Sequence, residues 1–169
     1  MVNPLNIKPQ LLNDIVRLLE SNARLDVADM ASALGISVDE AARLLADLEK
    51  EKFILAYKTI FDPEKIQRKP VRAVIEVKIT PERGGGFDKL SRRIAGFEEV
   101  TSCFLMSGAY DLLVFLEGES LKEVALFVSE KLATLPGVIS TATHFMLKTY
   151  KEQGIIFSAP THSRLPISP

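Results

Sequence analysis

The chain has 169 residues, of which 47% are hydrophobic and 25% are charged, a composition that excludes an intrinsically disordered protein. The net charge is −1, so the whole chain exerts no long-range attraction on nucleic acid, and any field that binds DNA must be local. No apolar run is long enough to span a bilayer or to act as a secretory signal in residues 1–10, so we expect a cytoplasmic protein without membrane contact.

The first predicted elements are two helices. Apolar residues recur every three or four positions from Leu11 to Leu19, and Pro9 suits a first helical turn, where its missing N–H is harmless. A second, shorter helix follows the N-capping residue Asp26 and ends at Gly35, which adopts positive φ without strain. The chain is therefore expected to turn at Gly35.

A third helix is predicted from Ser37 onward. Ser37 is an N-capping residue, and Glu40 completes a capping box ahead of a buried side that runs from Ala41 to Leu48. Two short helices joined by a tight glycine turn form a helix-turn-helix, whose second helix enters the major groove of DNA. The third helix is therefore the predicted reading element.

The predicted DNA contacts lie on a mostly acidic helix. Between Val38 and Glu49 one arginine stands against four carboxylates, which gives this segment a net charge of −3. Because phosphate neutralisation supplies most non-specific affinity, binding must rely on the few basic residues near the helix, on helix-terminal amides and on several copies acting together. The residues predicted to face DNA are Ser37, Asp39, Glu40, Arg43, Asp47 and Lys50, with Lys52 and Lys58 as further basic candidates. The alternative is a three-helix domain that lacks tight DNA contact.

The segment after the third helix contains β-branched and aromatic residues from Phe53 to Phe61, which predict a strand or wing. The polar residues 62–70 contain two prolines, as expected between domains. The predicted organisation is a winged helix-turn-helix domain at residues 1–61, a hinge at 62–70, a second domain at 71–150 and a tail at 151–169.

The second domain alternates strands with helices. The apolar patterns predict, in order, strand 71–80, helix 87–97, strands 98–107 and 110–117, helix 121–132 and strand 138–150. This βαββαβ order predicts a ferredoxin-like domain, in which an antiparallel four-stranded sheet carries both helices on one face, so the fold class is α+β. The other sheet face would expose an apolar patch, and we therefore expect a homodimer.

Motifs in both domains resemble the leucine-responsive/asparagine regulator (Lrp/AsnC) family of transcriptional regulators. The N-terminal motifs are Asn22-Ala23-Arg24-Leu25, Ala33-Leu34-Gly35-Ile36-Ser37, Leu48-Glu49 and Ile54-Leu55-Ala56-Tyr57. The C-terminal motifs are residues 102–113, with the family's glycine, any residue, tyrosine, aspartate turn, and Leu135-Pro136-Gly137-Val138. The chain departs from the family on the second half of the recognition helix, where several basic residues are replaced by Leu44, Ala46 and Asp47.

The resemblance implies a sequence-specific regulator that binds double-stranded DNA and is controlled by a small effector, with an amino acid as the expected class. It also implies a homodimer, or an octamer of four dimers, with paired recognition helices in successive major grooves. In the family, effectors sit near the turn between dimers, and the predicted effector-binding residues are Gly108, Tyr110, Asp111, Thr141 and Thr143. The alternative is that Gly108 and Asp111 only close a hairpin.

No catalytic, metal or cofactor site is predicted. Cys103 lies in an apolar segment and is interpreted as a packed thiol, and as the single cysteine it excludes an intrachain disulfide. His144 has no recognisable catalytic context, and one cysteine with two distant histidines does not make a zinc site. Two alternatives to a DNA-binding regulator are a ligand-sensing module and an enzyme similar to tetrapyrrole decarboxylases, which resemble this two-domain architecture.

Overall fold

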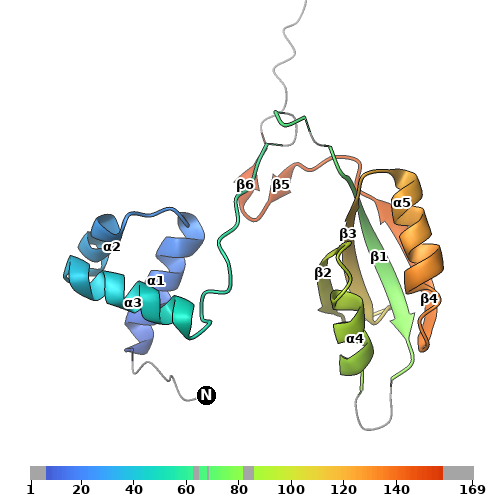
Figure 1. Cartoon of the computed structure of the whole chain (residues 1–169), viewed down its shortest axis with the longest axis horizontal. Helices are drawn as coiled ribbons and strands as arrows, with labels where there is room; N and C mark the ends of the chain where they lie inside the picture. Colours follow the sequence, from blue (N-terminus) through green and yellow to red (C-terminus); the bar gives the residue numbers. More distant parts are fainter. Residues whose placement is uncertain (1–6, 63–64, 68, 82–85, 158–169) are drawn as a thin grey trace, which may run out of the picture. The chain divides into compact units, whose positions relative to one another are not determined.

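The computed structural model describes residues 7–62, 65–67, 69–81 and 86–157 of the chain. The chain divides into two compact units, Met1–Ile60 and Phe61–Pro169. The first unit contains helices, and the second contains a four-stranded antiparallel sheet with helices, which confirms the predicted α+β class (Figure 1). In the part of the chain that the structure describes, no helix is long and apolar enough to cross a membrane.

The three predicted helices of the first unit are present. They are α1 (Pro9–Ser21), α2 (Val27–Leu34) and α3 (Val38–Lys50). The Asp26 carboxylate caps α2 by accepting a hydrogen bond of 2.8 Å from the N–H of Ala28. The apolar sides of the helices meet in one core, which includes the buried residues Ile15, Met30, Ala31, Ala41 and Leu48.

The strand expected from Phe53 to Phe61 is absent from the described part of the first unit, so the prediction of a wing was wrong. Lys52 adopts a φ of +60°, and Phe53 N–H bonds to Leu48 O at 2.9 Å, which ends α3. The following residues run without regular structure, and the side chain of Leu55 is 83% exposed. The side chains suit a strand, but a strand also needs a neighbour for its N–H and C=O groups, and none of the described strands pairs with this segment.

The second unit has the predicted βαββαβ order. Its elements are β1 (Val71–Ile79), α4 (Asp88–Ala95), β2 (Val100–Leu105), β3 (Leu112–Gly118), α5 (Leu121–Leu126), η1 (Phe127–Leu132) and β4 (Val138–Phe145). The sheet order is β2-β3-β1-β4, and all neighbouring strands are antiparallel. The ferredoxin-like prediction is therefore confirmed (Figure 1).

Both helices cover the same face of the sheet. Alternate residues of β1 are buried, and Ile75 lies opposite Val114 of β3, so the two side chains share this face. They pack in one cluster with Ile94 of α4 and Leu132 of η1. The opposite face, called the open face, carries Val74 of β1, Leu113 and Phe115 of β3 and Phe104 of β2.

The helix predicted at 121–132 is divided into an α-helical half, α5, and a π-helical half, η1. The wider π turn places the consecutive residues Phe127 and Val128 on the buried side, together with Leu132. An ordinary helix turns about 100° between neighbours and would separate them more.

The last strand is shorter than predicted, since β4 ends at Phe145 rather than at residue 150. A small hairpin of β5 (Lys151–Glu152) and β6 (Ile155–Ile156) follows, with Gln153 and Gly154 at positive φ in its turn. The predicted tail thus begins with an ordered hairpin, and residues 158–169 lie outside the described residues.

Candidate DNA-reading surface and effector turn

The turn between α2 and α3 is held by local hydrogen bonds. α2 ends at Gly35 with a φ of +66°, and the N–H of Ile36 returns to the carbonyl oxygen of Ala31 at 3.1 Å. Ser37 Oγ then accepts a hydrogen bond of 3.2 Å from the N–H of Glu40 and caps α3. These contacts fix α3 against α2 in the helix-turn-helix arrangement that the sequence predicts.

All six residues predicted to face DNA are exposed: Ser37, Asp39, Glu40, Arg43, Asp47 and Lys50. α3 buries Ala41 and Leu48. At about 100° per residue, the strip of α3 opposite these two side chains contains Asp39, Arg43, Ala46 and Lys50. The sequence therefore places one acidic, one small and two basic side chains at the centre of the exposed surface, with Glu40 and Asp47 beside them.

Arg43 is fixed to its own helix by one hydrogen bond. Its Nε donates to the backbone oxygen of Asp39, four residues earlier, at 3.2 Å. Among the described residues no carboxylate forms an ion pair with the Arg43 guanidinium. The two terminal amino groups of the side chain are therefore available to a ligand.

The C-terminal end of α3 contacts the segment that follows it. The Tyr57 hydroxyl donates a hydrogen bond of 2.8 Å to Oε1 of Glu49. Burial and this contact with a carboxylate both raise the pKa of Tyr57, burial being the larger cause. The sequence did not predict this bond, because Tyr57 was assigned to a strand.

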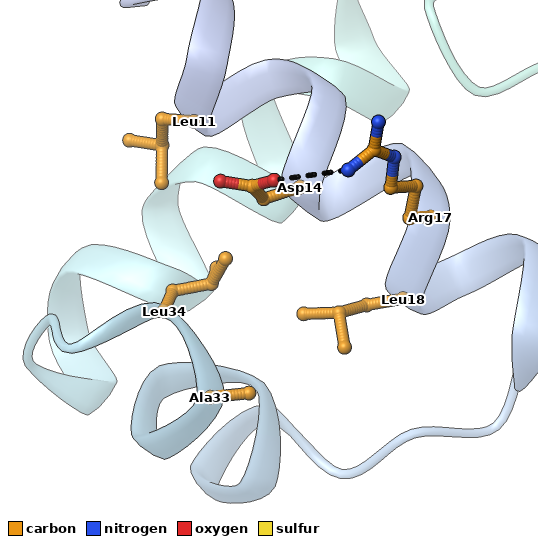
Figure 2. Close-up of a pocket in the computed structure, with 6 residues that line it drawn as sticks. All are labelled: Leu11, Asp14, Arg17, Leu18, Ala33 and Leu34. Carbon is orange, nitrogen blue, oxygen red and sulfur yellow. Dashed lines mark ion pairs between the residues drawn. The ribbon is translucent and has the colours of Figure 1, made fainter.

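A groove of about 320 Å³ lies between α1 and α2. Figure 2 shows the residues that line it. Its lining is aliphatic except for Asp14 and Arg17, whose side chains approach each other to 4.0 Å (Figure 2). None of the predicted effector residues lines it, because they all belong to the second unit. The predicted effector site is thus a surface at the end of the sheet rather than this groove.

The carboxylate of Asp111 has a structural partner. Asp111 Oδ2 accepts a hydrogen bond of 2.8 Å from the N–H of Ile79, and the N–H of Asp111 donates to Val77 O at 3.0 Å. The paired residues of β1 and β3 end at Val77 and Leu112, and the two hydrogen bonds of Asp111 extend the contact between these strands by one more residue. The preceding turn contains Gly108 with a φ of +152°, and Tyr110 is half-buried. This geometry favours a turn-closing role for Asp111 and leaves its role toward an effector a prediction.

Thr141 and Thr143 lie on the helix-covered side of β4, because their partners on β1, Val77 and Ile75, point to that side. Thr141 is half-buried and Thr143 is exposed, since the helices do not cover this edge strand completely. Asp111 also bonds to Val77, so the structure brings Asp111 and Thr141 to the same end of the sheet. Thr143 lies two residues farther along β4.

Sequence reasoning missed an ion network around Arg72. Its two terminal nitrogens donate to the carboxylate of Glu152 at 2.7 and 3.0 Å, and its Nε lies 3.2 Å from Glu117 Oε1. The pKa of Glu152 is lowered, and the largest cause of the lowering is the hydrogen bond from Arg72. This network ties the C-terminal hairpin to the sheet, and no local pattern signals it because Arg72 and Glu152 are 80 residues apart.

Cys103 and His144 have ordinary surroundings. Cys103 is half-buried on β2, and burial raises the pKa of its thiol, which agrees with a packed side chain. His144 Nε2 lies 3.4 Å from Glu76 Oε1 on the open face. Within the described ranges, no group of three or more His, Cys, Asp or Glu side chains is placed to hold a metal ion.

The same division into helices and a ferredoxin-like unit occurs in known proteins. Residues 72–156 match the family model of the Lrp/AsnC ligand binding domain. An uncharacterized HTH-type transcriptional regulator of Bacillus subtilis, YugG, is 45% identical over 158 residues, which cover 92% of this chain and 95% of YugG. The chain belongs to the Lrp/AsnC family.

More distant relatives match over most of the chain. The leucine-responsive regulatory protein of Escherichia coli is 24% identical over 141 residues, 82% of this chain and 84% of that protein. A transcriptional regulator of Neisseria meningitidis, solved as a complex with L-methionine, has a TM-score of 0.64 and 24% identity, and the match covers 95% of this chain and all of that one. These relatives are transcriptional regulators, which favours that reading over a decarboxylase-like enzyme.

Proposed function

We propose that this Lrp/AsnC chain is a sequence-specific DNA-binding regulator whose assembly and operator affinity respond to a free amino acid. The observation that carries the proposal is the exposed surface of α3. The turn at Gly35 and the cap at Ser37 hold α3 against α2, and the strip with Arg43 and Lys50 faces away from the core. This is how a recognition helix presents side chains to a major groove.

The charge of α3 sets the conditions under which binding is expected. Arg43 and Lys50 stand on a helix with four carboxylates, so one copy gains little from phosphate contacts. When two copies are joined in one assembly, the second copy binds the same duplex in an intramolecular step. The assembly therefore binds DNA more tightly than one copy, although each copy makes the same contacts. DNA affinity is therefore expected to depend on assembly.

A homodimer is part of the proposal, and the open face of the sheet supports it. Phe104 is 51% exposed and stacks edge-to-face on Phe115, with ring centroids 6.0 Å apart. Strand β4, at the opposite edge of the sheet from β2, exposes Ile139 and Phe145. Apolar side chains at an open face and an unpaired edge are usually covered in assembled proteins, and a second copy offers the same surface in return.

The effector is proposed to be an amino acid at the end of the sheet that carries both the Gly108–Asp111 turn and Thr141. The relatives named for leucine response and solved with L-methionine support this class. Tyr110 offers a half-buried ring beside the turn. The protein is not proposed to be an enzyme.

The test is DNA binding by the full chain to the duplex upstream of its own gene, at about 50 and about 200 mM salt, with and without L-leucine or L-methionine. The proposal expects binding that favours this duplex over a shuffled one, weakens with salt and changes with one amino acid. Light scattering on the same samples reports the assembly state. Equal affinity for both duplexes, or no binding at about 50 mM salt, contradicts the proposal and favours a ligand-sensing module that keeps only the fold.

A further inference from the structure

We infer that Arg43 reads a guanine base in the major groove and does not serve as a phosphate contact. The inference rests on the proposed function, since it assigns one side chain of the DNA-reading surface to one kind of base. Three features of α3 carry it: where Arg43 lies, how its guanidinium is held, and which charges surround it.

The position of Arg43 suits base contact. At about 100° per residue, it lies about 160° around α3 from Ala41 and about 140° from Leu48, the two buried residues of the helix. It is the sixth residue of α3, within the N-terminal half. In helix-turn-helix proteins, side chains of that half reach the base edges while other elements contact the backbone.

The hydrogen bond of Arg43 leaves the right atoms available. Nε donates to Asp39 O at 3.2 Å, and no carboxylate among the described residues pairs with the guanidinium, so its two terminal amino groups remain available as donors. This pair of donors forms a planar fork, and guanine offers two acceptors, O6 and N7, on its major-groove edge. The helix therefore prepares the side chain for a bidentate contact with little further loss of rotamer freedom.

The neighbours of Arg43 disfavour a phosphate. Asp39 and Asp47 lie four residues before and after it, and Glu40 lies three before, so each is about one helical turn away. A phosphate held by Arg43 would stand beside these three carboxylates and be repelled by them. A base edge carries no net charge, so the same carboxylates oppose a contact with it less than they oppose a contact with a phosphate, and this difference favours the base over the backbone as the partner of Arg43.

The experiment starts with a duplex selected by the full chain from a randomised pool, in which each guanine is then replaced in turn by 7-deazaguanine. This base pairs normally but lacks N7. The wild type is expected to lose about 5-fold to 150-fold in affinity at one guanine position per half-site, the range of one bidentate contact. Arg43→Ala is expected to bind the normal and modified duplexes equally well.

Two further variants separate base reading from charge. Arg43→Lys keeps the charge but not the planar fork, so it is expected to show a smaller 7-deazaguanine effect than the wild type. Lys50→Ala is the matched control on the same strip, and it is expected to keep the full 7-deazaguanine effect of the wild type. Thermal unfolding of each variant, in which exposed side chains alone are changed, checks that the fold is retained.

The inference is overturned if Arg43→Ala weakens every duplex by one factor, keeps the 7-deazaguanine effect, and is rescued by Arg43→Lys, because a phosphate contact behaves in this way. That result leaves the proposed function standing. If the selection yields no duplex that the wild type prefers over random DNA, the proposed function fails and the inference fails with it, so the two failures are distinguishable.

Discussion

Replacing Asp111 tests whether the turn at the end of the sheet is structural, effector-binding or both. Its Oδ2 accepts the N–H of Ile79, a residue whose side chain is almost fully buried. Asp111→Ala removes the acceptor and leaves that donor without a partner, which costs about 1–3 kcal/mol. Asp111→Asn keeps an oxygen in the same place and is expected to cost less than about 1 kcal/mol.

The stability assay is urea unfolding of the full chain followed by circular dichroism. Glu98→Ala is the matched control, because Glu98 is an exposed carboxylate of the same unit, and its effect is expected to stay within about 0.5 kcal/mol. If Asp111→Ala is as stable as the wild type, the structural role of the Asp111 carboxylate is refuted. A loss in Asp111→Asn equal to that in Asp111→Ala would show that the charge, rather than the acceptor, matters.

Effector binding by the same variants is measured by calorimetry with L-leucine and L-methionine. A carboxylate that receives an amino group contributes about 1.5–3 kcal/mol, so Asp111→Asn is expected to bind the effector at least about 10-fold more weakly while it stays folded. Unchanged amino-acid affinity in Asp111→Asn would remove Asp111 from the predicted effector residues and assign it to the turn alone.

Three further predictions concern stability. Gly35→Ala is expected to cost about 1–2 kcal/mol in thermal unfolding, because φ is +66° while an added Cβ meets no atom within 4 Å, so the cost is conformational. Since Arg72 lowers the pKa of Glu152, that ion pair stabilises the fold at neutral pH and is lost as the pH falls below the ordinary value of 4.5. Wild type is therefore expected to lose more stability between neutral and acid pH than Glu152→Gln, and parallel pH profiles would contradict this. Leu132→Ala is expected to cost about 2–5 kcal/mol in urea unfolding, whereas Leu147→Ala, at a side chain that is 95% exposed, is expected to change stability by less than about 0.5 kcal/mol.

Local signals in the sequence predicted most of the fold. Ser37 caps α3 and Gly35 ends α2, because a capping hydroxyl and a residue without Cβ act on their immediate neighbours. The alternation along β1 likewise predicted its buried face, since each residue's side is fixed by the period of a strand. Such features depend on a few adjacent residues, which a single sequence contains.

Features that depend on a distant partner were predicted wrongly or were not predicted. The side chains of Phe53–Phe61 are typical of a strand, but strand formation depends on a neighbour that the local sequence cannot specify. The link between Arg72 and Glu152 joins the first strand to the final hairpin. The face on which Thr141 lies follows from its register with Val77, near an irregularity at Ile79, and register is a property of the folded sheet.

The fold of α3 and its reading surface are determined by different residues, so the likeness of the fold does not decide what the helix binds. Ala41 and Leu48 hold the helix in the core, and any exposed side chain between them is compatible with that packing. In this chain the exposed side carries four carboxylates beside Arg43 and Lys50, while the packing side is apolar. Because the exposed residues are independent of the packing residues, we expect specificity to depend on Arg43 rather than on many phosphate contacts. DNA affinity is then expected to depend on how many copies assemble on the duplex.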